Sequence, residues 1–228
     1  FVLLNTGSKI IFSKNRLLTT IAYRIKGKTT YAMEGSIFIA GAGVQWLRDK
    51  MLFIKKASET EKIIKSLQDN KGIYLVPAFT GLGAPYWDAN ARGVLSGLTR
   101  DTGPKEIIRA TIEAVAYQTY DLFEAMKHDG LKPKLVKVDG GMVMNNWFSQ
   151  FLCDVVNVKV SRPKVQETTA LGAAFMAGLH IGVYKSLKDI SKKWSLDRNF
   201  TPKISPKVRS NLVKGWSEAI KKTITKTI

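Results

Sequence analysis

Several features that define whole classes of protein are missing from this chain of 228 residues. No apolar run reaches about 18 residues, the minimum for a helix that crosses a bilayer. The first residues include no basic segment followed by an apolar stretch and a small-residue cleavage site, which is the pattern of a secretory signal. We therefore expect neither a membrane span nor secretion, and we expect a cytoplasmic protein.

Cysteine and histidine are also scarce. The sequence has one cysteine, Cys153, so an internal disulfide is excluded. Its two histidines, His128 and His180, lie far apart in the chain and lack the spacing of a metal site. These absences favour a reduced scaffold that does not depend on a metal.

Acidic residues are few: 18 Asp and Glu stand against 36 Lys and Arg, which gives a formal charge of +18. Such an excess often marks a partner that carries phosphate groups. Here the basic residues are scattered and mostly lysine, which lacks the planar fork with which arginine grips phosphates and bases. Aromatic residues are not interleaved with the basic runs, as stacking on bases would require. We predict a solvated lysine-rich surface and no nucleic-acid partner, and we keep DNA binding as the last hypothesis.

What the chain does contain is an ordinary globular composition, with 45% hydrophobic and 24% charged residues. This is enough material for one large domain or two small ones. Residues 1–5, 17–25 and 29–34 are β-prone runs separated by Gly7 and Gly27. They predict an antiparallel meander.

The next part of the chain predicts two helices, a strand and a loop. From Gly41 the apolar residues take helical spacing, and a polar helix is expected over residues 58–68. Residues 73–76 predict a buried strand, which Pro77 ends. Glycine and proline then exclude regular structure over residues 78–88, which are expected to form a loop.

The second half alternates helices with strands. A long helix begins near Pro104. Its apolar face, which anchors the core, consists of Ile107, Ile108, Ile112, Val115, Leu122, Phe123 and Met126. A strand, a helix, a strand and a helix follow at residues 135–138, 146–153, 158–160 and 169–182. This alternation is typical of βαβ units and an α/β sheet. Past residue 185 the chain is lysine-rich, and an amphipathic helix is expected over residues 208–224.

One segment with chemical potential is residues 137–147, where an apolar strand runs through Gly140-Gly141 into a helix. Glycine lets the backbone approach a ligand closely, and a helix start offers exposed N–H groups to an anion or polar ligand. Asn145, one turn on, is placed to reach the same ligand. The alternative, that the glycines only make a tight connection, stays open.

A second segment is residues 33–49, where Gly41 and Gly43 flank the start of a helix and Gln45 follows one turn later. Gly41 and Gln45 are therefore candidates to face one ligand. The segment is not a P-loop, because no Lys followed by Ser or Thr closes it, and no dinucleotide fingerprint fits. Close helix packing through the glycines is the alternative.

The third segment, residues 77–88, is a glycine-rich aromatic loop. Such a loop is either a binding loop or a rigid Ω-loop packed by its own side chains. The acidic residues show no spacing that forces a catalytic dyad, and Glu113 is expected on or beside the packed face of the long helix. No Ser-His-Asp or Cys-His set stands out.

Together, these three segments and several further phrases resemble the C-terminal domain of the FGGY carbohydrate kinases, most closely that of the glycerol kinases. The phrases lie at residues 5–7, 17–22, 31–35, 40–49, 77–88, 91–93, 97–100, 107–113, 138–145 and 169–174. Residues 97–113 look like the family's second signature. The loop at residues 79–87 is similar to that of glycerol kinases more than to that of xylulose or gluconate kinases. The resemblance runs from Phe1 to about residue 216.

The resemblance implies an α/β fold of the actin-like ATPase class, related to ribonuclease H, with a mixed sheet flanked by helices. Of the family's two domains, residues 1–228 correspond to the second, nucleotide-binding domain. Within it, residues 186–228 are expected to be a lysine-rich helical extension. The N-terminal domain is absent from this sequence.

The resemblance also assigns roles to residues. Those matching Gly41, Gln45, Gly141 and Asn145 line the ATP or ADP site in glycerol kinases, where glycine admits the backbone and amides offer donors and acceptors. Phe1 resembles the phenylalanine that packs against the glycerol carbons. No catalytic residue is assigned, because the phosphate loop, the catalytic aspartate and the carboxylates near Mg²⁺ match no part of this chain.

The implied function is the C-terminal half of an ATP-dependent enzyme that phosphorylates glycerol to sn-glycerol 3-phosphate and is inactive as this piece alone. Its cofactors are ATP and Mg²⁺, with the metal held mainly by the N-terminal half. Its partners are glycerol, ATP or ADP, and the N-terminal kinase domain; a homo-oligomer stays open. The alternatives are a kinase of another polyol or sugar in the same family and a catalytically inactive nucleotide-binding remnant.

Overall fold

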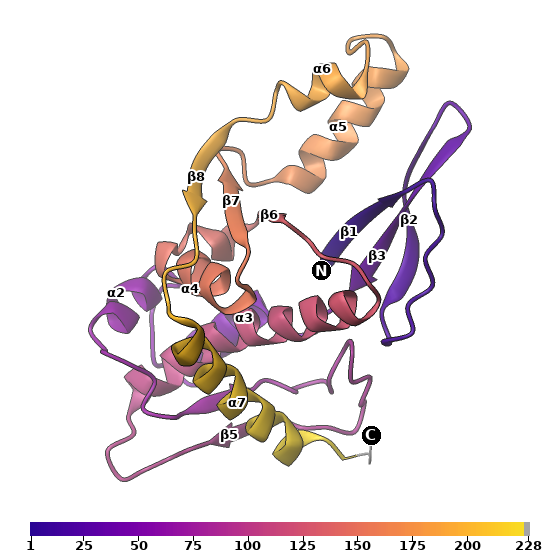
Figure 1. The fold of residues 1–228 in the computed structure, drawn as a ribbon. Coiled ribbons are helices and arrows are strands. Elements are labelled where there is room, and N and C mark those ends of the chain that lie inside the picture. Colours follow the sequence, from indigo (N-terminus) through magenta and orange to yellow (C-terminus); the bar gives the residue numbers. More distant parts are fainter. Residues whose placement is uncertain (226–228) are drawn as a thin grey trace.

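One long helix organises the chain, which is described from residue 1 to residue 225 in this computed structural model. Helix α3 runs through the middle of the molecule, and the other elements lie around it (Figure 1). The helices are α1 (Gly41–Asp49), α2 (Glu59–Lys65), α3 (Pro104–His128), α4 (Asn146–Val156), α5 (Thr168–His180), α6 (Leu187–Ser191) and α7 (Pro206–Thr223), with a 3₁₀ turn η1 (Gly141–Met144). Pro104 stands in the first turn of α3, where its missing N–H costs no helical hydrogen bond.

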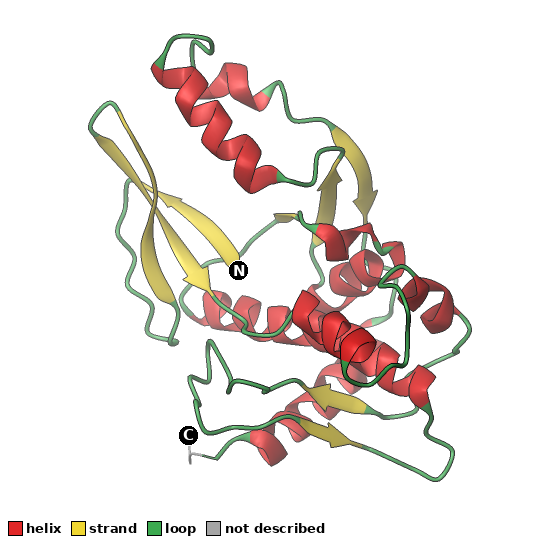
Figure 2. Cartoon of the chain, turned by 180° about the vertical axis from the view of Figure 1, so that it is seen from behind, coloured by secondary structure: helices red, strands yellow, loops and turns green. Residues whose placement is uncertain are grey.

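The strands form three small sheets that lie apart from one another (Figure 2). Their order is β1-β3-β2, β4-β5 and β6-β7-β8. The strands are β1 (Val2–Gly7), β2 (Leu18–Ile25), β3 (Lys28–Gly35), β4 (Tyr74–Val76), β5 (Val94–Ser96), β6 (Leu135–Lys137), β7 (Lys159–Pro163) and β8 (Leu196–Phe200).

The N-terminal sheet has the predicted antiparallel strands in a different order. β3 lies in the centre with β1 and β2 at its two edges, whereas a meander would place β2 in the centre, so the predicted meander is wrong. β2 and β3 are joined by Lys26 and Gly27, both at positive φ, a two-residue turn that makes a tight hairpin. The longer connection over residues 8–17 leaves β1 free to pair with the far edge of β3.

The predicted βαβ unit is present. β6 and β7 are parallel and are connected through η1 and α4, and β8 adds an antiparallel strand. The sheet β6-β7-β8 is therefore mixed. It is flanked by helices, as the expected α/β fold requires.

The C-terminal segment, residues 186–228, contains more than the predicted helix. It includes α6, β8 and α7, and β8 completes the third sheet. In α7 the side chain of Trp216 is 1% exposed, and its ring stacks on Tyr117 of α3 at a centroid distance of 5.3 Å. Helix α7 therefore belongs to the core. Residues 226–228 of the predicted extension lie outside the described range.

Aromatic packing around Tyr117 holds α3 to its neighbours. Besides Trp216, the ring contacts Tyr74 of β4 at 5.6 Å and Phe151 of α4 at 5.5 Å between centroids. Cys153, on the same helix as Phe151, is also buried. Aromatic pairs of this kind stabilise a core beyond the effect of the buried area alone.

Between residues 1 and 225, no helix combines the length and apolarity needed to span a bilayer.

Candidate functional site

A pocket of about 380 Å³ lies where α1, α2, α3 and η1 meet. Its lining comes from four separate stretches of sequence: Gly41, Val44, Gln45, Arg48, Ala57, Ser58, Thr60, Glu61, Ile112, Gly141, Met142, Met144 and Asn145. All four residues for which the resemblance implies nucleotide contact are among them. Two glycine motifs about 100 residues apart in the sequence thus face one space.

The glycines of these motifs differ in what a side chain would meet. A Cβ added to Gly41 or Gly141 would have no heavy atom within 4 Å, so each of these residues exposes bare backbone to open space. A Cβ on Gly43 would lie 3.0 Å from Cγ2 of Thr111 on α3. The packing alternative therefore holds for Gly43, whereas Gly41 and Gly141 have no packing neighbour that requires glycine.

Two helix starts open toward the pocket. α1 begins at Gly41 and η1 at Gly141, and neither has a side-chain cap. Gly140, which precedes η1, has a φ of +85°, a conformation that glycine adopts without strain. Uncapped N–H groups at a helix start attract anions and polar groups. The pocket therefore offers backbone donors in addition to its two charged side chains, Arg48 and Glu61.

Asn145 has a structural task in addition to its place in the pocket. Its Oδ1 accepts a hydrogen bond of 2.9 Å from the backbone N–H of Phe148 and so caps α4. Its Nδ2 donates to Oγ1 of Thr60 over 3.3 Å. The amide oxygen is thus committed to α4, which leaves the amide nitrogen as the group to offer a ligand.

Helix α2 supplies pocket residues that the sequence gave no reason to single out. Glu61 accepts a hydrogen bond of 3.1 Å from the backbone N–H of Asn146 and pairs with Lys65 at 2.5 Å. Burial raises the pKa of Glu61, but the hydrogen bonds from Lys65 and Asn146 outweigh it, and the net pKa is below the ordinary value. Glu61 therefore stays ionised and fixes the start of α4 against α2. An acidic residue in a short polar helix carries no sequence signal for this task.

A buried charge network lies on α3, the helix that contributes Ile112 to the pocket. Glu113 is fully buried and accepts hydrogen bonds from Arg109 at 2.7 Å and from Asn70 at 3.1 Å. The Arg109 guanidinium also lies over the ring of Trp147, 5.1 Å from its centroid. Burial raises the pKa of Glu113, and the nearby Arg109 offsets this only in part. The predicted position of Glu113 on the packed face is confirmed, and its partner stands four residues earlier, as a helical ion pair requires.

The other predicted contact, Phe1, lies elsewhere. It is 85% exposed and lines a second cavity, together with residues of β1 and β6. The structure therefore does not bring Phe1 into the pocket with the four nucleotide-contact candidates.

The aromatic loop of residues 77–88 is packed rather than open. Leu82 and Asp88 form a backbone bridge, and Leu82 is 3% exposed. The N–H of Ala84 donates to the carbonyl of Ser36 over 2.9 Å. Of the two alternatives for this segment, these contacts favour a rigid loop, held here by backbone hydrogen bonds within the loop and to Ser36.

Metal ligands do not converge within residues 1–225, where no group of three or more His, Cys, Asp or Glu side chains is placed to hold an ion. The one carboxylate in the pocket, Glu61, is already engaged by Lys65 and Asn146. The side chains of this part of the chain therefore do not fit a Mg²⁺ site by themselves.

Comparison with known proteins gives a consistent picture. Residues 1–181 match the FGGY family of carbohydrate kinases, C-terminal domain. Glycerol kinase 1 of Pseudomonas aeruginosa is 55% identical over 222 residues, which are 97% of this chain and 45% of that protein. This chain therefore spans less than half the length of the relative.

Solved structures share the fold. The crystal structure of Plasmodium falciparum glycerol kinase with ADP superimposes with a TM-score of 0.88 at 36% identity, over 99% of this chain and 45% of that one. A gluconate kinase from Lactobacillus acidophilus gives a TM-score of 0.79 at 23% identity, over 96% of this chain and 44% of that one. The second likeness shows the fold alone.

Proposed function

This chain belongs to the FGGY family of carbohydrate kinases, and from that premise we propose that it is the nucleotide-binding, C-terminal half of an ATP-dependent glycerol kinase. The whole enzyme transfers the γ-phosphoryl group of ATP to glycerol and gives sn-glycerol 3-phosphate. The observation that carries this proposal is the pocket in which Gly41, Gln45, Gly141 and Asn145 meet. Identity of 55% to a glycerol kinase supports the choice of glycerol. A kinase of another polyol of the family is the alternative.

In this proposal the pocket takes the adenosine part of ATP. Apolar side chains of Val44 and Ile112 offer a surface for the base, and the bare backbone at Gly41 and Gly141 admits the nucleotide closely. The amide of Gln45 and the Nδ2 of Asn145 supply neutral polar contacts. The related Plasmodium falciparum glycerol kinase was solved with ADP, which supports a nucleotide as the ligand that we assign to this pocket.

Phosphoryl transfer depends mainly on positioning and on charge stabilisation by metal, phosphate loop and base. We assign these groups to the N-terminal half, including most of the Mg²⁺ ligands, and assign glycerol contact to Phe1. When bound, Mg²⁺ neutralises charge on the phosphates. The role of the present chain is to bind and orient the nucleotide. We further propose a cytoplasmic enzyme, and a homo-oligomer remains an open part of this proposal.

The site assignment is tested by Gly141→Val in the full-length protein, with Gly172→Val as the matched control. Neither glycine has a heavy atom within 4 Å of an added Cβ, but only Gly141 lines the pocket. We expect Gly141→Val to weaken ADP binding about tenfold or more, because filling the approach to a well-fitted ligand costs about 1–3 kcal/mol. Calorimetry on the folded protein measures this. Equal ADP affinity of the two variants would remove the pocket from the proposal.

The half-enzyme assignment is tested with the two halves as separate chains. The 228-residue chain alone should phosphorylate no glycerol above background, and added N-terminal half should restore part of the activity, limited by the cost of association. Turnover by this chain alone, in a preparation free of host kinase, would contradict the assignment. A full-length protein that binds ADP but phosphorylates nothing would instead support an inactive remnant.

A further inference from the structure

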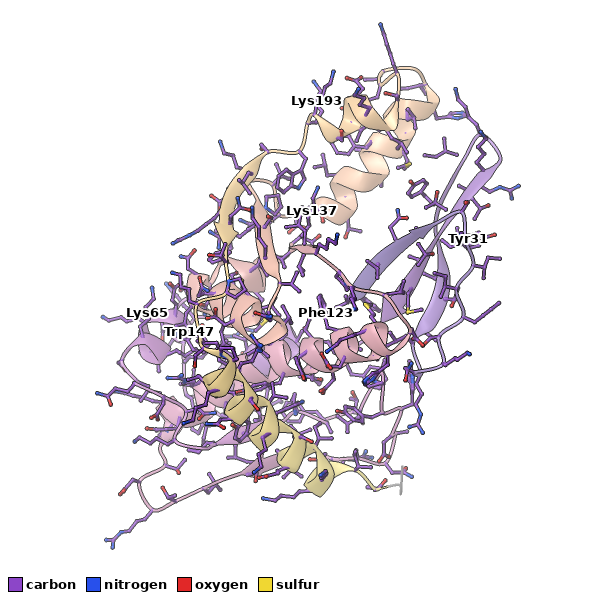
Figure 3. All side chains as sticks on the ribbon, viewed as in Figure 1. Tyr31, Lys65, Phe123, Lys137, Trp147 and Lys193 are labelled. Carbon is purple, nitrogen blue, oxygen red and sulfur yellow. The ribbon has the colours of Figure 1, made fainter. Side chains whose placement is uncertain are left out.

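The segment between β6 and α4 supplies four of the residues that line the pocket: Gly141, Met142, Met144 and Asn145. In Figure 3, Lys137 at the end of β6 and Trp147 in the first turn of α4 mark the two ends of this segment. Most of the segment is the single 3₁₀ turn η1, and so short a turn contains few hydrogen bonds of its own. Groups outside η1 must therefore help to keep it in place.

Arg162 of β7 binds the end of η1. The residue is buried, with 5% of its surface exposed. Its Nη1 donates to the backbone carbonyls of Val143 and Met144 over 2.6 and 3.4 Å, and its Nη2 donates to Oδ1 of Asn146 over 3.1 Å. The two carbonyls stand at the end of η1, where a helix leaves carbonyls without partners of its own. One guanidinium thus joins the end of η1 to the start of α4, on both sides of Asn145 in the sequence.

Two further contacts hold Arg162 itself. Its Nε donates to Oδ2 of Asp197 on β8 over 2.7 Å, and its guanidinium lies over the ring of Phe200, 5.6 Å from the centroid. Since β8 pairs with β7 in the third sheet, these contacts tie the side chain to its own sheet. A planar guanidinium has five N–H donors in a fixed fork, which a lysine amine does not reproduce. The link from the sheet to the lining of the pocket therefore depends on the shape of arginine as well as on its charge.

We propose that Arg162 is a positioning residue for nucleotide binding, which holds η1 and Asn145 where they meet the adenosine part of the nucleotide. This inference rests on the proposed function of the pocket. Arg162 is not among the residues that line the pocket, so it acts through η1 and not by contact with the ligand. A small displacement of the groups that contact a ligand is enough to weaken a well-fitted site.

The alternative is that Arg162 only stabilises the fold, as the cation of a buried ion pair does. The identity of its acceptors favours the positioning role. Among residues 1–225, three of its four hydrogen-bond acceptors lie within two positions of Asn145, and the fourth is Asp197. A residue that served stability alone would have no reason to direct most of its donors to the lining of one pocket.

The first test compares Arg162→Met with Arg198→Met in the full-length protein. Arg198 of β8 is a matched control, because it also donates to Oδ1 of Asn146, over 3.3 Å, and also lies over Phe200, 5.2 Å from the centroid. Within the described part of the chain, however, Arg198 has no hydrogen bond to η1. We expect Arg162→Met to weaken ADP binding about tenfold, because it leaves the carbonyls of η1 without their donor, and Arg198→Met to change it less than about twofold. Calorimetry on the folded protein measures both, and equal affinities would overturn the proposal.

A third variant separates positioning from stability. Val160, on the same strand, is fully buried, so Val160→Ala lowers the unfolding midpoint through a cavity without touching η1. We expect this variant to bind ADP as the parent does, whereas Arg162→Met raises the KM for ATP about tenfold and leaves the KM for glycerol unchanged. If Val160→Ala weakens ADP binding as much as Arg162→Met, Arg162 acts through stability alone and the proposal is wrong.

Arg162→Lys keeps the test open if the methionine variant does not fold. Lysine keeps the positive charge beside Asp197, but its single amine cannot span the carbonyls of η1 and Asn146 together. We expect ADP binding to weaken about threefold or more. An affinity equal to that of the parent would show that charge alone is sufficient and would contradict the proposal.

Amide hydrogen exchange without nucleotide tests the support of η1 directly. The N–H of Asn145 donates to the carbonyl of Met142 over 3.2 Å, so its exchange reports on whether η1 is held. We expect this amide to exchange about tenfold faster in Arg162→Met and in Arg162→Lys, and at the parent rate in Arg198→Met. An unchanged rate in the Arg162 variants would overturn the proposal, and so would faster exchange with unchanged ADP affinity.

Failure of this inference is distinct from failure of the proposed function. A full-length parent protein that binds no ADP refutes the proposed function of the pocket. A parent that binds ADP, with Arg162 variants that bind it equally well, refutes the role of Arg162 alone.

Discussion

The pocket between α1 and α3 and the cavity between β1 and β6 are built in opposite ways. The pocket is lined by four stretches of this chain, and one of them, Ile112 of α3, is next in sequence to Glu113 of the buried ion pair. The cavity has a complete floor but open sides, with exposed leucines on both edges. The difference shows that polar and backbone groups gather around the pocket, whereas the apolar side chains that line the cavity stay partly exposed. We therefore expect the 228-residue chain by itself to be compact but marginally stable.

The substitution with the largest expected effect on stability is Arg109→Met in the 228-residue chain. It leaves the Glu113 carboxylate buried without its ion-pair partner, and such a loss costs about 3–5 kcal/mol. Urea unfolding measures the change. Lys127→Met is the control, because the ion pair of Lys127 with Glu124 is 3.3 Å long and both of its side chains reach the surface, and we expect little change. Similar losses in the two variants would mean that the buried ion pair stabilises the chain no more than a surface ion pair does.

A second test uses pH. Asp121 of α3 accepts a hydrogen bond of 2.7 Å from the indole of Trp216. Burial raises the pKa of Asp121 from 3.8 to about 7, and the hydrogen bond from Trp216 offsets this only in part. The folded state therefore holds a proton that the unfolded state releases between pH 4 and pH 7. The stabilisation that Asp121 contributes is fully present below about pH 4 and is lost as the pH rises to about 7. The free energy of unfolding falls by at most about 1.4 kcal/mol per pH unit over this range.

Asp121→Asn should remove this dependence, so the variant loses less stability than the parent chain between pH 5 and pH 8. Asp129, which follows the end of α3, gives the opposite sign as a control. Burial raises its pKa, but hydrogen bonds from Ser13, Lys14 and Asn15 bring it below the ordinary value, so its contribution is lost as the pH falls. If Asp121→Asn leaves the pH dependence of the free energy of unfolding unchanged, Asp121 is not the group that causes this dependence.

The smallest expected effect compares two glycines. Gly43→Ala brings a methyl group within 3.0 Å of Thr111, whereas Gly172→Ala in α5 meets nothing within 4 Å. Alanine is favoured over glycine inside a helix by about 1 kcal/mol. We expect Gly172→Ala to raise the free energy of unfolding of the 228-residue chain by up to that amount and Gly43→Ala to lower it. A stabilising Gly43→Ala would show that α1 and α3 are less tightly packed than the structure indicates.

Sequence patterns predicted most of the helices and strands, because most of them are determined by residues that lie close together in the sequence. The spacing of apolar residues predicted α3, and proline and glycine predicted where β4 ends and where the following loop lies. The strand order was not predicted correctly because two features determine it jointly. The tight turn at Lys26-Gly27 pairs β2 with β3, and the long loop before β2 lets β1 pair with the other edge of β3. β8 was missed because its burial pattern is exposed at four of its five positions, so no apolar alternation reveals it.

The candidate site was predictable only in part. Glycines near helix starts indicated Gly41 and Gly141, but spacing alone did not separate them from Gly43, which packs against Thr111. The resemblance to the FGGY carbohydrate kinases, and not the spacing, selected Gly41 and Gly141 as site residues. The tasks of Thr60 and Glu61 depend on contacts with residues about 85 positions away, Asn145 and Asn146. A local pattern contains no information on such contacts.

The position of Trp216 has a consequence for the order in which the protein is made. Its indole stacks on Tyr117 and donates a hydrogen bond to Asp121, and both the backbone N–H and the hydroxyl of Thr225 donate to the Asp88 carboxylate. Residues near the end of the chain thus cover contacts made by residues synthesised much earlier. Since chains emerge from the ribosome at about 5–20 residues per second, Tyr117 waits at least several seconds for its partner. During this time the aromatic face of Tyr117 that Trp216 later covers is exposed to solvent.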